Sequence, residues 1–272
     1  MYNFFYKEDG YLNKYTLGLA LLGVAGLLAG LILLMPQAIK AGKGILDARP
    51  QKMRLIVIKP QDCADCFDIY QVTDFIEQTL GIKYSHKKEY AAGSPNAELL
   101  IKTYKITTLP TFILQGDIEK AKLLELFDEA SVAFSDKKTF VYANKFPPFY
   151  GLEDKTIQGR FNITYLTDKA CDKCYDVYLH DIALNNLIMR PSASSTIDIS
   201  STEGKKFLSN YKIQYVPTIL LSGDLDAYQN FKELWQTVGT IEKDGSYVFR
   251  LDGLKSMGAY KNLWTGRLEN DK

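Results

Sequence analysis

The four cysteines of this 272-residue chain form two Cys-x-x-Cys pairs, Cys63 with Cys66 and Cys171 with Cys174. Two thiols at this spacing can close a local disulfide and pass it on by thiol–disulfide exchange. Paired cysteines also bind zinc, but a zinc ribbon places its two pairs about 15–20 residues apart. Here 104 residues separate Cys66 from Cys171. We therefore favour redox chemistry over a metal site, and predict no metal.

A proline follows each cysteine pair at nearly the same distance. Pro110 lies 47 residues after Cys63, and Pro217 lies 46 residues after Cys171. Residues 104–117 and 211–224 both begin with Tyr-Lys-Ile, pass through an apolar–Pro–Thr step into an apolar run, and end with Gly-Asp. Matches at an offset of 107 or 108 continue through most of 54–267. Two units of this size fit two autonomous domains of about 100–150 residues rather than a solenoid of short repeats.

The apolar spacing predicts the elements that must position these residues. In both units it indicates the order strand–helix–strand–helix–strand–strand–helix. In the first unit we expect a strand at 55–58, a helix from Cys63 to Leu80, a helix opened by Ser94 and Pro95, strands at 112–114 and 140–142, and a last helix within 143–159. In the second we expect a strand at 163–166, a helix from Cys171 through Leu187, a strand at 196–199, a helix after a capping box at Ser200–Glu203, and strands at 219–221 and 247–249. A helix beginning at a cysteine would stabilise the thiolate through its free N–H groups and its dipole.

This combination of dithiol, downstream apolar–Pro–Thr step and element order resembles the thioredoxin superfamily. The chain looks like two tandem thioredoxin-like domains of the α/β class, at 54–159 and 160–272, each a central mixed sheet flanked by helices. The layout is similar to that of two-domain protein disulfide oxidoreductases. The resemblance implies that Cys63 and Cys171 attack, that Cys66 and Cys174 resolve, and that redox-active disulfides replace a bound cofactor.

The resemblance also implies a role for the prolines. It makes Pro110 and Pro217 cis and places them against the dithiols, where neighbouring backbone is exposed to an extended substrate. The substrate-binding residues it implies are Leu109, Pro110, Thr111, Val216, Pro217 and Thr218. A plain proline at the start of a strand is the alternative. The motifs Cys-Ala-Asp-Cys and Cys-Asp-Lys-Cys depart from the Trp-Cys-Gly-Pro-Cys of thioredoxins, which leaves substrate and direction of electron flow open.

An uncharged run covers residues 15–39, and 17–35 is almost purely apolar. Nineteen helical residues span roughly 28 Å, close to the bilayer core of about 30 Å, and the run is longer than a signal-peptide core. We predict a retained transmembrane helix at 15–39, between a short segment 1–14 and a linker 40–53. Gly26 and Gly30 would let two such helices pack as a homo-oligomer, although incidental small-residue packing explains them equally well.

The orientation of this helix follows from the short amino-terminal side, which favours the cytoplasm. Everything after residue 40 would then lie outside the cell membrane, where disulfides persist. Expected partners are protein thiols or disulfides and a redox partner that the sequence does not name. Lysine and arginine total 33 against 32 acidic residues. No basic face stands out, so we expect no nucleic-acid binding.

Charges near the two cysteine pairs differ. Asp62 and Asp65 flank Cys63, whereas the second pair has Lys169 and Lys173 beside it together with acidic residues. A nearby cation favours a thiolate and a nearby carboxylate opposes it. We therefore predict the lower thiol pKa and the higher reduction potential at the second pair.

Two functions remain open at this point. One is a single-pass membrane thiol–disulfide oxidoreductase acting on extracytoplasmic proteins. The other is a non-catalytic binding or assembly module whose Cys-x-x-Cys pairs are locked as disulfides, since a fold does not fix a function. We interpret His86 and His180 as solvated or core histidines rather than catalytic ones.

Overall fold

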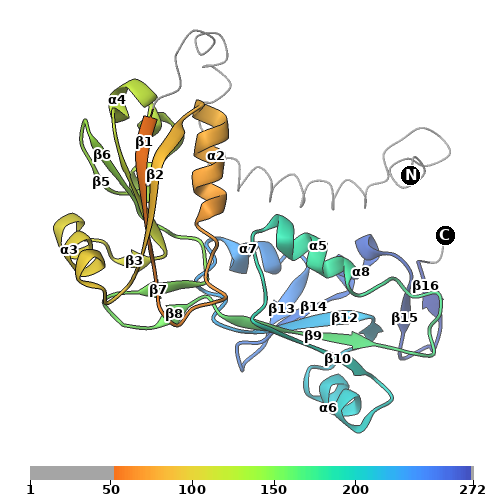
Figure 1. Cartoon of the computed structure of the whole chain (residues 1–272). Coiled ribbons are helices and arrows are strands. Elements are labelled where there is room, and N and C mark those ends of the chain that lie inside the picture. The colour runs from red at the N-terminus through yellow and green to blue at the C-terminus, as the bar shows by residue number, and fades with distance from the viewer. Residues whose placement is uncertain (1–51, 271–272) are drawn as a thin grey trace, which may run out of the picture. The chain divides into compact units, whose positions relative to one another are not determined.

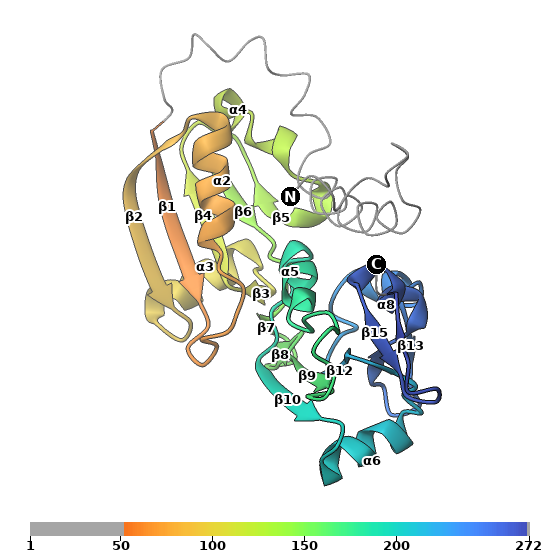
Figure 2. The same ribbon diagram turned by 90° about the vertical axis from the view of Figure 1, so that its right-hand side faces the viewer.

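The computed structural model describes residues 52–270. The predicted transmembrane helix at 15–39, the segment 1–14 and most of the linker 40–53 lie outside the described residues. Within 52–270, none of the helices has the length and apolar character needed to span a bilayer. The described chain separates into two compact units, the first ending at Gln158 and the second beginning at Gly159 (Figures 1 and 2).

The first unit is a mixed sheet with helices. Its strands are β1 (Lys52–Lys59), β2 (Lys83–Ala91), β3 (Thr108–Leu109), β4 (Thr111–Gln115), β5 (Val132–Ser135), β6 (Thr139–Tyr142), β7 (Phe149–Gly151) and β8 (Ile157–Gln158), and its helices are α2 (Tyr70–Leu80), α3 (Pro95–Tyr104), α4 (Ile118–Ala121) and the short 3-10 turns η1 (Leu123–Leu126) and η2 (Glu129–Ser131). The main sheet has the order β2-β1-β4-β6-β5. β1 and β2 run parallel, and the other neighbours are antiparallel.

Local signals explain the two longer helices of this unit. Gly81 ends α2 in the left-handed region, at φ 62°, which glycine adopts without steric cost. Ser94 caps α3 by accepting a hydrogen bond from the Ala97 N–H, and Pro95 occupies the first turn. Both of these boundaries were predicted and are confirmed.

The second unit repeats the arrangement. Its strands are β9 (Phe161–Thr167), β10 (Ala193–Asp198), β11 (Tyr215–Val216), β12 (Thr218–Gly223), β13 (Gly239–Ile241), β14 (Tyr247–Phe249), β15 (Tyr260–Asn262) and β16 (Leu268–Glu269), and its helices are α5 (Leu179–Asn186), α6 (Thr202–Asn210), α7 (Phe231–Trp235) and α8 (Leu251–Met257). The main sheet has the order β10-β9-β12-β14-β13, which is the order of the first unit.

Successive side chains along β12 point to opposite faces of the second sheet and pack into two separate cores. Ile219 and Leu221 of β12 pack with α5, α7 and α8 on one face. Leu220, between them in sequence, packs on the other face with Phe207 of α6. In both ribbon views α6 lies across the sheet from α5 (Figures 1 and 2). The sheet is thus covered on both faces, as the predicted mixed sheet flanked by helices requires.

Each unit also has a small second sheet that was not predicted. The strand before each proline pairs with a later hairpin, giving the orders β3-β7-β8 and β11-β15-β16. Leu109 pairs with Tyr150, and Val216 pairs with Lys261, in antiparallel registers. These hairpins lie along the backbone next to each proline.

The predicted helix starts at Cys63 and Cys171 are wrong. α2 begins at Tyr70 and α5 at Leu179, so each cysteine pair lies in a loop before its helix. A helix from Cys63 would need the N–H of Phe67 to bond the Cys63 carbonyl. That N–H instead donates to the Pro148 carbonyl at 2.8 Å, and the matching N–H of Tyr175 donates to Ala259 at 2.7 Å. Tertiary partners therefore hold the dithiol loops out of the helices.

Two smaller predictions also fail. Residues 143–159 hold β7 and β8 and no last helix, because Pro147 and Pro148 lack the N–H groups that a helix needs. The cap of α6 is Ser201, which accepts from the Gly204 N–H, rather than Ser200.

Candidate functional site

Both cysteine pairs are closed as disulfides at the ends of the first core strands. The Cα–Cα distance is 5.2 Å for Cys63–Cys66 and 5.4 Å for Cys171–Cys174. A backbone hydrogen bond closes each loop, 3.3 Å from Cys66 N–H to the Cys63 carbonyl and 3.2 Å in the second pair. All four cysteines are partly exposed. Neither pair is therefore enclosed in the core of its unit.

The two prolines are cis, as the resemblance implies, at Leu109–Pro110 and Val216–Pro217. Ile58 at the end of β1 pairs with Thr111, and Leu166 of β9 pairs with Thr218. Each proline step is therefore at the sheet end that the dithiol loop leaves. In the second unit the contact is direct, since Cys174 Sγ lies 3.8 Å from the Val216 carbonyl oxygen.

The dithiol loop and the cis-proline thus lie at the same end of each main sheet. Together with the shared strand order, this arrangement gives both units a thioredoxin-like fold. A third cis bond, Pro147–Pro148 in the first thioredoxin-like unit, was not predicted from the sequence.

Comparison with known proteins adds no argument about this chain. No protein-family model matches the chain and no curated protein matches it. Among solved structures, it is similar to the NTD_N/C domain of alkylhydroperoxide reductase AhpF from Enterococcus faecalis, with 14% sequence identity, 66% of this chain and 86% of that chain covered, and a TM-score of 0.20. It is also similar to ERdj5, with 10% identity, 78% of this chain and 28% of that chain covered, and a TM-score of 0.16. Scores this low carry no argument about function, so the fold assignment rests on the strand order and the cis-prolines.

The residues expected to bind substrate are all buried in both thioredoxin-like units. Leu109 and Val216 have no exposed surface, and the prolines and threonines that follow them are buried too. The Thr111 hydroxyl donates to the Tyr142 carbonyl, and the Thr218 hydroxyl donates to the Phe249 carbonyl at 2.8 Å. The backbone before each proline is paired with the hairpins described above. The structure therefore brings these residues to the dithiols but leaves none of them on the surface.

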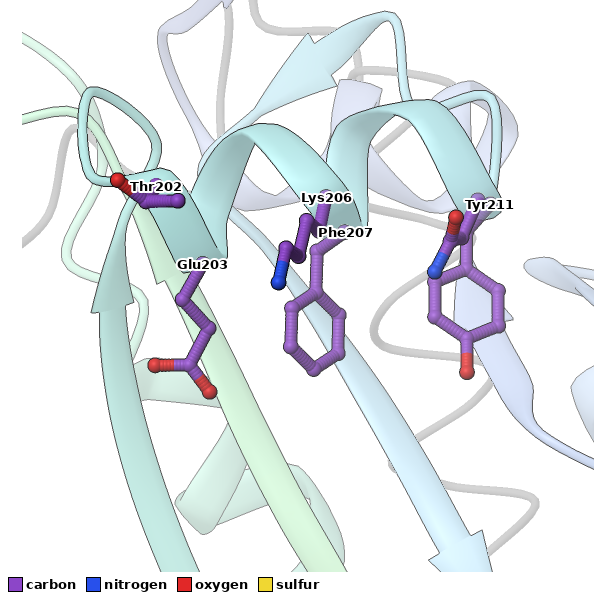
Figure 3. Close-up of a pocket in the computed structure, with 6 residues that line it drawn as sticks. Thr202, Glu203, Lys206, Phe207 and Tyr211 are labelled. Carbon is purple, nitrogen blue, oxygen red and sulfur yellow. The ribbon is translucent and has the colours of Figure 1, made fainter.

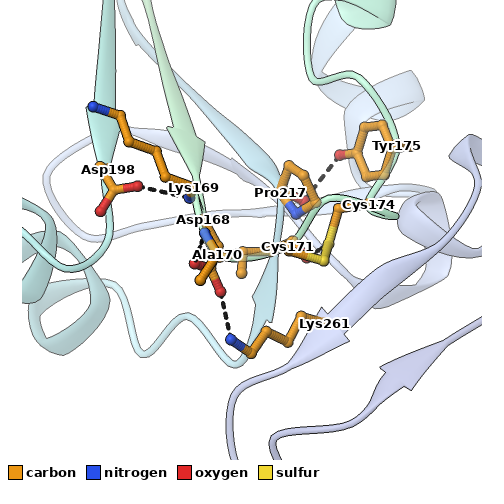
Figure 4. Close-up of a disulfide and its surroundings, with 10 residues drawn as sticks. Asp168, Lys169, Ala170, Cys171, Cys174, Tyr175, Asp198, Pro217 and Lys261 are labelled. Carbon is orange, nitrogen blue, oxygen red and sulfur yellow. Dashed lines mark hydrogen bonds and ion pairs between the residues drawn. A yellow bond between two sulfur atoms is a disulfide. The ribbon is translucent and has the colours of Figure 1, made fainter.

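Charges at the second dithiol include one that the sequence did not reveal. Lys261 of β15 forms a 2.6 Å ion pair with Asp168, whose carboxylate also accepts the Ala170 N–H at 2.9 Å (Figure 4). Hydrogen bonds from the Ser200 hydroxyl and the Lys169 N–H lower the pKa of the Asp198 carboxyl below its usual range. At the first dithiol, Cys63 Sγ lies 3.7 Å from Oδ1 of Asp65.

The sequence also missed a polar contact behind the second dithiol. The hydroxyl of Tyr175 lies 2.9 Å from the Pro217 carbonyl oxygen and 3.1 Å from Nε2 of His180. His180 is a core residue with 3% of its surface exposed, in agreement with its interpretation as a structural histidine. Burial lowers the pKa of its imidazole to about 3 and raises the pKa of the Tyr175 hydroxyl.

Two pockets lie in the second unit, away from the cysteines. One of about 520 Å³ is lined by α6 residues and Tyr211 (Figure 3). Its lining comes from a single helix and its cap, so it is an open helix surface. The other, of about 310 Å³, is lined mainly by apolar side chains of α5, α7 and α8, with His180 in its wall. Within residues 52–270 there is no cluster of three or more potential metal ligands.

Proposed function

We propose that this protein is a thiol–disulfide oxidoreductase with two active dithiols. The observation that carries this is the second site, where a partly exposed disulfide lies 3.8 Å from the carbonyl that precedes a cis-proline. The first unit repeats the dithiol, the cis-proline and the strand order. The same arrangement in both units supports two working sites rather than one.

The exchange is written here in the reducing direction. The thiolate of Cys171 attacks one sulfur of a substrate disulfide, whose S–S bond breaks, and the leaving sulfur takes a proton. Cys174 then loses its proton and attacks the Cys171 sulfur, closing the internal disulfide and releasing the second substrate thiol. Two electrons pass to the substrate, and a dithiol protein must reduce Cys171–Cys174 again. The oxidising direction is the reverse, with a disulfide protein as the final oxidant.

The proposal includes a membrane anchor at 15–39 and extracytoplasmic thioredoxin-like units. It rests on the uncharged run in the sequence and on the chemistry of disulfides outside the cell. Protease added from the outside should cleave residues after 40, and protease added on the cytoplasmic side should not. Cleavage from the cytoplasmic side alone would reverse the orientation.

A second candidate function follows from the hairpins that pair with the backbone before each cis-proline. Leu109 and Val216 already pair with hairpins of their own unit, so an extended peptide cannot add there as a strand. This observation favours a binding or assembly module whose disulfides stay closed.

A redox titration of the full-length protein against glutathione and dithiothreitol separates the two functions. Oxidoreductases have dithiol potentials of about −120 to −270 mV, whereas structural disulfides in secreted proteins lie below about −300 mV. We expect both pairs in the first range. Two values below about −300 mV would establish the module instead.

A further inference from the structure

A chain of hydrogen bonds leads from the second cis-proline into the core. The Pro217 carbonyl oxygen can only accept, so the single hydroxyl proton of Tyr175 is used in the 2.9 Å bond to it. The 3.1 Å contact between Tyr175 and His180 must then be donated by the imidazole. His180 is therefore the neutral tautomer with its proton on Nε2. Its ring is held against Phe249, with centroids 4.5 Å apart.

Tyr175 is the residue directly after Cys174, and it is fixed at three points. Its hydroxyl donates to the Pro217 carbonyl (Figure 4). Its N–H donates to the Ala259 carbonyl at 2.7 Å, and its hydroxyl oxygen accepts from His180. These bonds tie the residue after Cys174 to the proline step. The Cys174 sulfur lies 3.8 Å from the Val216 carbonyl oxygen.

The first unit has no such chain. Phe67 follows Cys66 as Tyr175 follows Cys174, and Val72 takes the place of His180. Both are buried, and neither side chain has a hydrogen-bonding atom. The N–H of Phe67 still makes its bond, to Pro148. The units therefore share the backbone anchor and differ in the link to the proline carbonyl.

We propose that Tyr175, held in place by His180, is a positioning residue for the resolving cysteine of the second site. This inference rests on the proposed oxidoreductase function and deepens it. Once the disulfide is reduced, Cys174 carries an S–H that can donate weakly to the Val216 carbonyl. That bond stabilises the protonated thiol, so negative charge collects on Cys171, the attacking sulfur. The second site is thereby made more oxidising than the first, because its reduced form is stabilised.

The test uses the full-length protein with Cys63→Ser and Cys66→Ser, so that only the second dithiol reacts. In this parent, Tyr175→Phe with His180→Val copies the buried pair of the first unit and removes both polar side chains together, so that the Pro217 carbonyl loses the Tyr175 hydroxyl. We measure the equilibrium constant with glutathione and the rate at which a Cys171–glutathione mixed disulfide is resolved by Cys174. We expect the double variant to resolve about tenfold more slowly, because Cys174 is then no longer held in place beside Cys171 and this effect outweighs the easier loss of its proton. We also expect its equilibrium to shift three- to tenfold towards the disulfide, where tenfold corresponds to about 30 mV.

Two further measurements make the result decisive. Cys174→Ala is added to the parent and to the double variant, and the alkylation rate of Cys171 is measured in each. The two rates should be equal, since Tyr175 acts on the resolving sulfur. If the emission of Trp235 in the second core shows that the double variant does not fold, the reverse substitutions are made in the first unit instead. Phe67→Tyr with Val72→His, in a parent with Cys171→Ser and Cys174→Ser, should then speed resolution at Cys66 by a similar factor.

The outcomes are distinguishable. A folded double variant that matches its parent in equilibrium and in resolution rate overturns the positioning role and leaves the oxidoreductase function standing. A parent dithiol that does not equilibrate with glutathione at all sinks the proposed function, and this inference with it.

Discussion

Lys261 Nζ lies 2.6 Å from Oδ2 of Asp168, a residue 93 positions earlier in the chain. The side chain of Asp168 is 7% exposed and that of Lys261 is 28% exposed. The Asp168 carbonyl accepts the N–H of Cys171 at 2.9 Å, so the pair lies at the base of the second dithiol loop. Tyr150 has the place of Lys261 in the first unit, paired with the residue before the cis-proline. The ion pair therefore adds to the charge difference that Lys169 and Lys173 already indicate.

Lys261→Met should raise the thiol pKa of Cys171. The substitution keeps an unbranched side chain only one atom shorter and removes the cation, so the Asp168 carboxylate is left to oppose the thiolate. Because Lys261 is partly exposed, we expect a rise of only about half to one pKa unit. Alkylation rate against pH measures it in a full chain with Cys63→Ser and Cys66→Ser. Lys255→Met, which breaks the ion pair with Asp252 on α8, is the control. An unchanged or lower pKa would contradict the prediction.

Removal of a resolving cysteine should trap substrates. Cys66→Ala or Cys174→Ala leaves Cys63 or Cys171 without the thiol that breaks the mixed disulfide. We expect adducts that disappear on reduction, seen on non-reducing gels of cell extracts. The double variants Cys63→Ala/Cys66→Ala and Cys171→Ala/Cys174→Ala should trap none at the altered site. Absence of adducts from well-folded single variants would favour the binding module.

Breaking the pairing between β3 and β7, next to Pro110, should allow extended substrates to bind there. Tyr150→Pro removes the N–H that Tyr150 offers to the β3 ladder, because proline cannot donate to a sheet. We expect an extended cysteine peptide to form a mixed disulfide at Cys63 several-fold faster, with little change for glutathione disulfide. Tyr150→Ala shortens the side chain but keeps the N–H, and is the matched control. Equal acceleration by both substitutions would show that the ladder does not limit access.

The buried His180 should make the second unit less stable in acid. Its pKa is about 3 in the folded protein and about 6.5 in an unfolded chain. Between these values the unfolded state binds the extra proton, so stability falls as the pH drops below about 6.5. From pH 7 to pH 5, protonation of His180 in the unfolded state lowers the free energy of unfolding by about 2 kcal/mol.

Urea unfolding followed by tryptophan emission measures this effect. Both tryptophans, Trp235 and Trp264, belong to the second unit, so the signal reports that unit alone. Tyr175→Phe with His180→Val removes the titrating group and should flatten the pH dependence by the same amount. Parallel pH profiles for the protein and this variant would rule out His180 as the cause.

Much of the fold follows from the sequence alone. The duplication, the apolar strands β4 and β6 with their counterparts, the Gly81 and Ser94 helix boundaries and the two cis-prolines beside the dithiols were all predicted. The strands and helix boundaries depend on residues near one another in the chain or on a periodic apolar pattern. The duplication was read from matches at a fixed offset, and the cis-prolines were implied by the resemblance to the thioredoxin superfamily. The edge strand β2 is mostly exposed, so it has no such pattern and no position was assigned to it.

Other features were decided only by tertiary contacts. The helices begin after the cysteine pairs because Phe67 and Tyr175 give their N–H groups to carbonyls more than 80 residues away. The backbone before each cis-proline is paired because a hairpin from the end of the same unit folds back onto it. Lys261 reaches Asp168 because it lies on the hairpin of the second unit. A polar group shows no sign in the sequence of which distant partner it will meet. The sequence therefore determined which residues could carry the chemistry, and the folded chain decided which atoms surround them, because those atoms come from segments that only packing brings together.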